Sequence, residues 1–405
     1  MACADPNVAG SLSLEEAIQS RLRYEITSGA AADVGNSDIL PRYNALASGE
    51  VLLAGRRGGS LEWPHMLFKE DSDSGSGSTM SISADGKYVA TTCEDATILV
   101  WELQRGTAVR RLEGHTDTVW AVAFAPSSVH LVSGSGDATA KVWDIESSTA
   151  VVTLEGHETD VWAVVYSPDG TKIATGSTDC TVKVWDAFTG EQLHSFDEHS
   201  AHVMHIAFSP NGTFLASCAD DKAFVWNPET GDKVSELQGH TGAIWCMRFS
   251  NGSDRIITGS EDNTSRIWDV QTGEELVTLH EHTSPVWSVG FSPDDKEIVS
   301  GSYDCTIVTS DSFSGEQLLL FSDDTNPSAI DTVAYSTNGD LIASGSADGP
   351  IRLWDARVGD LLAEYRGHSD KVKGISFTPD NTVLVSSSED GTVRAWSVRD
   401  VLRFF

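Results

Sequence analysis

A tryptophan recurs at a nearly constant interval along this chain. Successive tryptophans lie 41 or 42 residues apart across the first five of these positions, and 42 apart across the last two. The interval between Trp268 and Trp354 is two periods long, and Ser310 occupies the missing place. A fixed period of this length predicts one small structural unit repeated eight times, because each copy can bury its apolar face only against its neighbours. The tryptophans are Trp101, Trp143, Trp185, Trp226, Trp268, Trp354 and Trp396.

Each copy alternates apolar and polar residues in short runs. Val161 to Tyr166 is followed by a Ser-Pro-Asp-Gly turn, then by Lys172 to Thr175, a tight turn at Asp179, and a run that ends at Trp185. Period-two alternation broken by Asp-Gly and Thr-Gly turns is typical of β-hairpins. The unit is therefore expected to be a small antiparallel sheet.

Two further signals recur in register with the tryptophan. An aspartate usually follows it, and Gly-His or Glu-His pairs precede most copies. A period of this length with Trp-Asp and Gly-His resembles the WD40 family, over residues 62–405. The resemblance implies an all-β, eight-bladed β-propeller of four-stranded blades, or a seven-bladed ring if the weakest copy is excluded. The repeats are expected to end near residues 102, 144, 186, 227, 269, 311, 355 and 397.

The resemblance also implies a buried hydrogen-bond chain in each blade. It would join the His, a Ser or Thr on the second strand, the turn Asp and the Trp. The expected members are His115, Ser133, Asp137 and Trp143 in blade 2; His157, Thr175, Asp179 and Trp185 in blade 3; His240, Thr258, Asp262 and Trp268 in blade 5; and His368, Ser386, Asp390 and Trp396 in blade 8.

Some copies depart from the pattern. Blades 1 and 7 have no His at the expected place, blade 4 has a shorter turn at Asp220 and Asp221, and blade 6 has Ser310 for Trp. A partly satisfied buried network is costly, so blades 6 and 7 are expected to form a softer sector.

The segment before the first copy is expected to close the ring. Few residues follow Trp396, whereas Trp63 to Lys69 is apolar and extended in character. We predict that it supplies the outer strand of blade 8. Residues 1–61 form an extension in which Ser13 to Glu16 is a capping-box pattern that predicts a short helix near residues 14–25. The extension is either a flexible tail or a docking or oligomerisation helix.

Charge restricts the class of partner. Acidic residues number 60 against 27 Lys and Arg, for a net charge of −33. Such a surface repels nucleic-acid backbones and anionic lipid and attracts basic partners. The six cysteines form no CxxC pair, and the chain shows neither a signal peptide nor an apolar run long enough to span a bilayer. These features favour a cytoplasmic or nuclear protein.

In WD40 proteins that bind peptides, the residue after the first strand valine faces the central opening. The resemblance therefore implies a partner site on the top face, the face that carries the His loops. Exposed aromatic residues with acids among them suit a basic or apolar peptide anchor. The alternative is that these side chains only pack the inner strands. The candidate residues are Trp120, Trp162, Met204, Trp245, Trp287, Asp331 and Lys373, with His202, Glu261 and Tyr303 beside them.

Catalytic and metal chemistry finds little support. His199, His202 and His205 lack further ligands at metal-site spacing. Neither a phosphate-binding loop nor a nucleophile elbow occurs, and the turn aspartates are explained by the fold. We expect no cofactor, no metal and no enzymatic activity. The leading hypothesis is a protein–protein interaction scaffold or adaptor in a larger complex, with a chromatin reader or corepressor subunit as the alternative and a propeller-based enzyme as a remote one.

Overall fold

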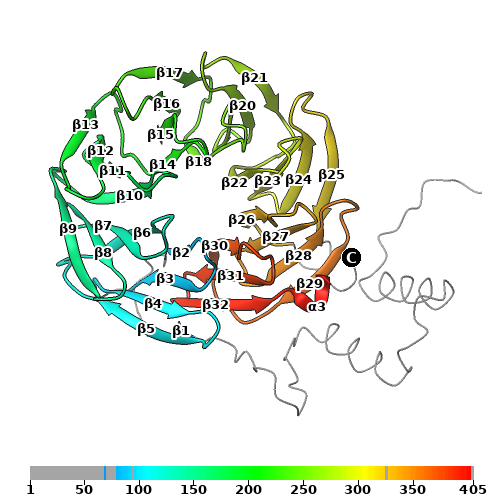
Figure 1. The fold of residues 1–405 in the computed structure, drawn as a ribbon. Helices are drawn as coiled ribbons and strands as arrows, with labels where there is room; N and C mark the ends of the chain where they lie inside the picture. The colour runs from blue at the N-terminus through cyan, green and yellow to red at the C-terminus, as the bar shows by residue number, and fades with distance from the viewer. Residues whose placement is uncertain (1–67, 70–78, 94, 324–326, 403–405) are drawn as a thin grey trace, which may run out of the picture.

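The computed structural model describes residues 68–69, 79–93, 95–323 and 327–402. The strands form eight four-stranded antiparallel sheets, arranged as the blades of a closed ring (Figure 1). In blades 1 to 7 the four strands follow one another in the chain from the inside of the ring outward. The eight-bladed β-propeller expected from the repeat is confirmed, and the seven-bladed alternative is wrong because the copy around Trp101 forms a blade of its own.

Blades 1 to 4 occupy the first half of the ring. Their strands, innermost first, are β2 (Met80–Ile82), β3 (Tyr88–Thr92), β4 (Ile98–Glu102) and β5 (Thr107–Leu112); β6 (Val119–Phe124), β7 (His130–Ser135), β8 (Thr139–Asp144) and β9 (Thr149–Glu155); β10 (Val161–Tyr166), β11 (Lys172–Ser177), β12 (Val182–Asp186) and β13 (Gln192–Phe196); and β14 (His205–Phe208), β15 (Leu215–Ala219), β16 (Lys222–Trp226) and β17 (Lys233–Gln238).

Blades 5 to 8 complete it. Their strands are β18 (Ile244–Phe249), β19 (Arg255–Ser260), β20 (Ser265–Asp269) and β21 (Glu275–Leu279); β22 (Val286–Phe291), β23 (Glu297–Ser302), β24 (Thr306–Asp311) and β25 (Gln317–Ser322); β26 (Ile330–Tyr335), β27 (Leu341–Ser346), β28 (Ile351–Asp355) and β29 (Leu361–Tyr365); and β30 (Val372–Phe377), β31 (Val383–Ser388) and β32 (Thr392–Ser397), with β1 (Phe68–Lys69) outermost.

The ring is closed by a strand from the far end of the chain. β1 pairs antiparallel with β32, and Phe68 lies opposite Val393. The prediction that the segment ending at Lys69 supplies the outer strand of blade 8 is confirmed for Phe68 and Lys69, whereas residues 63–67 lie outside the described residues. A short helix, α3 (Arg399–Leu402), follows the last strand. The extension of residues 1–61, with its expected helix at 14–25, also lies outside the described residues.

The core lies between blades. One apolar cluster joins Val132 and Val142 of blade 2 to Val161, Ile173 and Trp185 of blade 3. Each sheet therefore buries its face against the next sheet, as the repeat pattern requires.

Glycines on the second strands allow this close packing. A Cβ on Gly176 would lie 2.8 Å from Val203 Cγ1 of the next blade, closer than real contacts allow. Val203 is itself fully buried. This position therefore excludes any side chain if the two blades are to pack together.

The tight turns between second and third strands contain a left-handed residue. Cys180 has φ 67° and Cys305 has φ 72°, and each lies directly after the turn aspartate of its blade. Asn263 adopts the same conformation in blade 5, with φ 69°. The two cysteines are therefore placed as turn residues. Among the described residues, no helix is long and apolar enough to cross a membrane.

Candidate functional site

A hydrogen-bond chain runs through the interior of blade 3. His157 Nε2 lies 2.7 Å from Thr175 Oγ1, and the Trp185 indole N–H donates to the same oxygen at 2.9 Å. The other imidazole nitrogen, Nδ1, lies 2.9 Å from Asp179. The Thr175 hydroxyl is thus a buried hub that connects the loop before the blade to its second and third strands.

The same geometry recurs in blades 2, 5 and 8. The distances from His Nε2 to the hydroxyl are 2.7, 2.8 and 2.7 Å for His115–Ser133, His240–Thr258 and His368–Ser386. The indole N–H groups of Trp143, Trp268 and Trp396 donate to these hydroxyls at 2.8, 2.8 and 2.9 Å, and the His Nδ1 atoms lie 2.7, 2.8 and 3.3 Å from Asp137, Asp262 and Asp390.

Burial and hydrogen bonding set the charges of this network. Burial tends to raise the pKa of Asp179, but hydrogen bonds from Thr181, the Glu158 amide and His157 together lower it to about 2. Burial lowers the pKa of His157, and its bond to Asp179 opposes that shift. Asp179 therefore remains ionised at pH 7 and accepts hydrogen bonds from the residues around it in the blade.

Blade 4 has the same hydrogen-bond chain of His, hydroxyl and Trp, but without the aspartate carboxylate that binds the His in blades 2, 3, 5 and 8. His199 Nε2 lies 2.7 Å from Ser217 Oγ, and the Trp226 indole donates to the same atom at 2.9 Å. The Phe224 ring meets the imidazole edge-on, with 4.8 Å between centroids. Burial lowers the pKa of His199 to about 4. This imidazole is therefore neutral at pH 7.

Blade 6 keeps His282, Ser300 and Asp304 in the expected contacts but lacks the indole. The hydroxyl of Ser310 instead donates to Glu281, the residue just before His282. Burial raises the pKa of this carboxyl. The glutamate thus extends into the region that the tryptophan occupies in other blades.

Blade 7 contains a pairing that sequence reasoning missed. Arg352, two residues before Trp354, is fully buried, and its guanidinium lies 3.0 Å from Asp323 and donates to Ser346 Oγ at 2.8 Å. The blade keeps the bond from the Trp354 indole to Ser344, at 2.9 Å. The sequence feature that could have revealed this pair is a charged residue on a strand whose other residues are buried. A fully buried arginine requires an acidic partner.

The top-face candidates lie at the start of the inner strands. In blades 2, 3, 5, 6, 7 and 8 the pairing register shifts at the second residue of that strand, which forms a β-bulge. A bulge re-aims the side chain of its extra residue away from the regular face of the sheet. The bulge residues are Trp120, Trp162, Trp245, Trp287, Asp331 and Lys373, and Met204 directly precedes β14 in blade 4. We call these seven the rim residues.

The rim tryptophans stack in pairs across neighbouring blades. Trp120 and Trp162 lie 4.5 Å apart between ring centroids, with 11° between their planes, and Trp245 and Trp287 lie 4.7 Å apart at 23°. Met204, in the blade between the two pairs, is 39% exposed. The four indole rings are half-buried. The structure therefore brings these five residues together as an arc.

The remaining candidates border this arc. Tyr303 is 47% exposed and its ring lies 6.3 Å from that of Trp287. Glu261 and His202 are exposed. Asp331 is half-buried, and burial raises its pKa although the charge of Lys373 opposes that shift. Lys373 lies 2.9 Å from Glu389, so its charge is partly compensated within blade 8.

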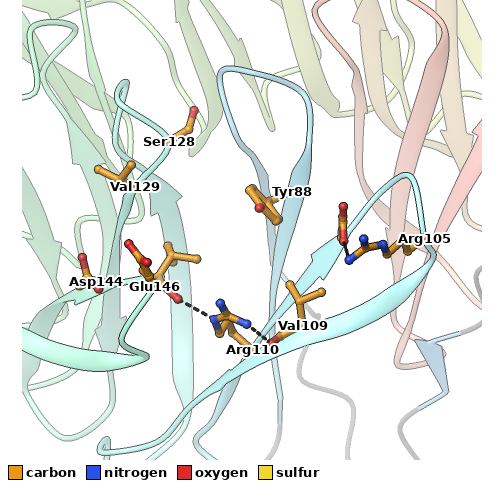
Figure 2. Close-up of a pocket in the computed structure, with 10 residues that line it drawn as sticks. Tyr88, Arg105, Val109, Arg110, Ser128, Val129, Asp144 and Glu146 are labelled. Carbon is orange, nitrogen blue, oxygen red and sulfur yellow. Dashed lines mark hydrogen bonds and ion pairs between the residues drawn. The ribbon is translucent and has the colours of Figure 1, made fainter.

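A separate pocket of about 440 Å³ lies where blade 1 meets blade 2. Figure 2 shows that its lining comes from Tyr88 on β3, the outer hairpin of blade 1 and the turns of blade 2. Arg110 is held there by the carbonyl oxygens of Ile145 and Val109, at 3.0 and 2.8 Å, and Arg105 pairs with Glu102 at 3.0 Å. None of the predicted site residues contributes to this pocket.

Metal ligation is not supported by the described part of the chain. Within residues 68–69, 79–93, 95–323 and 327–402, no group of three or more His, Cys, Asp or Glu side chains could hold an ion. His199 is bonded to Ser217, as noted above, and His202 is exposed.

Comparison with known families decides the classification. The family model described as WD domain, G-beta repeat, matches eight segments: residues 74–102, 106–144, 148–186, 190–227, 231–269, 273–308, 315–355 and 359–397. The chain belongs to the WD40 family. Each matched segment ends at or close to the tryptophan position of one blade, and the segment at 273–308 stops just before Ser310.

Individual relatives resemble short parts of this WD40 protein. The pre-rRNA-processing protein IPI3 of Mycosarcoma maydis is 46% identical over 54 residues, which is 13% of this chain and 9% of the relative. Subunit I of eukaryotic translation initiation factor 3 from Schizosaccharomyces pombe is 41% identical over 49 residues, 12% of this chain and 15% of the relative. The matches thus span only a small part of each relative's length.

One solved structure is similar over nearly the whole ring. The crystal structure of the computationally designed Ika8 protein matches with a TM-score of 0.71 and 33% identity, over 80% of this chain and 97% of that chain. The similarity supports the propeller architecture across all the blades.

Proposed function

We propose that this WD40 protein is a non-catalytic interaction scaffold that holds a partner protein on its top face, at the rim residues. The observation that carries the proposal is the pair of indole stacks, Trp120 with Trp162 and Trp245 with Trp287, on either side of the exposed Met204. Half-buried aromatic clusters with a flexible methionine between them are typical of binding hot spots.

The chemistry of the rim favours a partner segment that contains Lys or Arg. The chain has a net charge of −33, so cationic partners are attracted to it over long range. At the rim, Glu261 is exposed and the Asp331 carboxylate has one buried oxygen without a hydrogen-bond partner. A cationic side chain placed over the indoles would gain cation–π attraction and would satisfy the Asp331 carboxylate.

Membership of the WD40 family supports the scaffold function, because WD40 propellers generally act as interaction platforms. The relatives are named for pre-rRNA processing and translation initiation, which supports a place in a larger complex in the cytoplasm or the nucleus. A basic tail, such as a histone tail, would suit the same rim, so a chromatin reader is one form of the same proposal.

Affinity purification from native extract tests the proposal. We expect wild type to retain a defined partner set, and we expect the double variant Trp162→Ala, Trp245→Ala to lose at least one member of it. Phe188→Ala is the matched control, because Phe188 is a 70% exposed aromatic residue on the β12–β13 turn, away from the rim residues. An identical partner set for wild type and the double variant, with both correctly folded by circular dichroism, would contradict rim docking.

A further inference from the structure

The outer strand of blade 6 differs from its counterparts at one position. In blades 1 to 5 and in blade 7, the outer-strand residue ten positions after the closing Trp is polar or charged. In blade 6 the equivalent position is counted from Ser310, which replaces the Trp. Blade 6 has Leu320 there, and it is 56% exposed. The residues at this position in blades 1 to 7 are Arg111, Thr153, Ser195, Glu236, Thr278, Leu320 and Glu364.

In blades 2, 3, 4 and 7 this polar residue has a partner on the third strand. The Lys183 ammonium donates to Ser195 at 3.1 Å, and the Arg352 guanidinium lies 3.6 Å from Glu364. In blade 6, Leu320 lies opposite Val308, which is fully buried. Blade 6 therefore has an apolar cross-strand pair at this position instead of a polar one. No other residue of the blade buries the exposed part of Leu320.

Leu320 belongs to a larger apolar surface. Leu318, two residues earlier on the same face of β25, is 44% exposed, and Phe313 in the β24–β25 turn is 68% exposed. The opposite face of β25 is the one that packs inward, because Leu319 and Phe321 join the cluster of Trp354. The Phe313 ring packs on the guanidinium of Arg255 in blade 5, at 4.2 Å, so we call Leu318 and Leu320 alone the β25 strip. About half of each leucine side chain is exposed to water, so a partner that buries the strip gains hydrophobic stabilisation.

The outer edge of β25 is a second feature of this surface. β25 ends its sheet, and none of the described strands pairs with its outer edge. Edge strands are normally protected by charged side chains, yet Gln317–Ser322 contains none. By contrast, β5 carries Arg110 and Arg111. An uncharged edge with exposed apolar side chains on alternate residues is a template for strand addition.

We propose that the β25 strip binds an extended segment of a partner protein, which adds to blade 6 as a fifth strand. The segment has apolar side chains at alternate positions, to cover Leu318 and Leu320, and a Lys or Arg at the end that lies near Glu316, which is exposed just before β25. A second copy of this chain is disfavoured because two bodies of net charge −33 repel each other. This surface lies on the outer edge of the ring, so the proposal does not depend on rim docking.

A random dodecapeptide library displayed on phage, selected against the full chain, tests the proposal. We expect enriched peptides with alternating apolar residues and a terminal cation. For the synthesised peptides, we expect Leu318→Thr, Leu320→Thr to weaken Kd by about tenfold or more, since loss of two leucine contacts exceeds 1.4 kcal/mol. Threonine suits a strand, and blades 2 and 5 carry it at the position of Leu320. N-methylation of the peptide amides that face β25 should abolish binding. N-methylation of the alternate set, which faces away from β25, should leave binding intact.

Two control variants separate this surface from other sites. Leu276→Thr changes a leucine that is 50% exposed on β21 and should leave peptide affinity unchanged. Trp162→Ala, Trp245→Ala should also bind the peptides normally, which distinguishes failure of this proposal from failure of rim docking. Peptides that bind the Leu318→Thr, Leu320→Thr protein as well as wild type, or a selection without any enrichment, would overturn the proposal. So would sedimentation showing that the free protein is a dimer that Leu320→Thr dissociates.

Discussion

The hydroxyl of Ser310 donates a hydrogen bond to the carboxylate of Glu281, and the two residues stand where blades 2, 3, 5 and 8 have a tryptophan and a glycine. In blade 2, a Cβ on Gly114 would lie 3.3 Å from Cη2 of Trp143, and in blade 5 a Cβ on Gly239 would lie 3.1 Å from Cη2 of Trp268. In blade 6 the larger Glu281 replaces the glycine and the smaller Ser310 replaces the tryptophan. The space between the two positions therefore remains filled.

The exchange predicts an energetic coupling between these two positions. Ser310→Trp alone should destabilise the protein by about 1–3 kcal/mol, because the indole meets the glutamate side chain. Glu281→Gly alone should also destabilise it, because it leaves a cavity beside Ser310. The double variant should recover at least about 1 kcal/mol relative to the sum of the single changes. Urea denaturation of the four proteins measures this coupling, and additive effects would refute it.

Blade 4 provides the internal comparison. It has Glu198 before its His, yet it keeps Trp226. Glu198 is exposed and pairs with Lys233 instead of entering the blade. Glu198→Gly should therefore change stability by no more than about 0.5 kcal/mol, as expected of a surface substitution.

The Thr175 hydroxyl of blade 3 predicts a loss of stability even when a substitution leaves the side-chain volume unchanged. Thr175→Val preserves volume but removes the acceptor of the Trp185 indole and the partner of His157. Two buried polar groups then lose a hydrogen bond, and we expect a loss of about 1–3 kcal/mol in the free energy of unfolding. Thr153→Val, on the exposed strand β9, is the matched control and should lie within about 0.5 kcal/mol of wild type. Equal effects of the two changes would exclude the network as the cause.

The neutral imidazole of blade 4 predicts a pH dependence of stability. Burial lowers the pKa of His199 from 6.5 to about 4, so between these values the unfolded chain binds a proton that the folded protein does not. Stability contributed by His199 is therefore complete above pH 6.5 and is lost as the pH falls toward 4, by roughly 3 kcal/mol at most. Urea denaturation between pH 4.5 and 7.5 should show a flatter profile for His199→Gln than for wild type. His202→Gln, at an exposed site, should retain the wild-type profile.

Ring closure predicts a local effect at blade 8. Lys69→Pro removes a backbone N–H from β1, which pairs with β32. We expect faster amide hydrogen exchange in Thr392–Ser397, together with a lower melting temperature. Exchange in β15 and β16 of blade 4, on the opposite side of the ring from the closure, should remain unchanged. If Thr392–Ser397 exchanges at the wild-type rate, the two-residue β1 contributes little to closure.

The periodicity made the architecture predictable in detail. The Trp-Asp spacing predicted eight blades but left a seven-bladed ring as the alternative, because a weak copy can be excluded from a ring of repeats. The sheet formed by β2 to β5 decided between them. The closing strand could be predicted because the final copy, after Trp396, lacked residues for an outer strand while Trp63 to Lys69 offered them. The His, hydroxyl and Trp positions follow from the same register, so their contacts could be anticipated as well.

The departures from the repeat were harder to predict. The missing indole of blade 6 was visible, but its replacement by Glu281 depends on which way one glutamate turns, and Glu198 in blade 4 turns outward. The Arg352–Asp323 pair occupies two positions that also meet in blade 5, as Arg266 and Gly239, but blade 7 alone places an acidic residue beside the arginine there. Stacking of the rim indoles depends on the β-bulges, which the alternation of apolar residues does not indicate. The function of the rim residues stays a prediction.

The pairing of β1 with β32 also has a consequence for biosynthesis. Because Phe68 lies opposite Val393, β1 has no partner until β32, which follows all the other strands of the ring, has been synthesised. A product that stopped before β32 would carry two open sheet edges, one at each end of an incomplete arc, and both would be prone to aggregate. The synthesis of β32 therefore determines whether the edges of the earlier blades are protected.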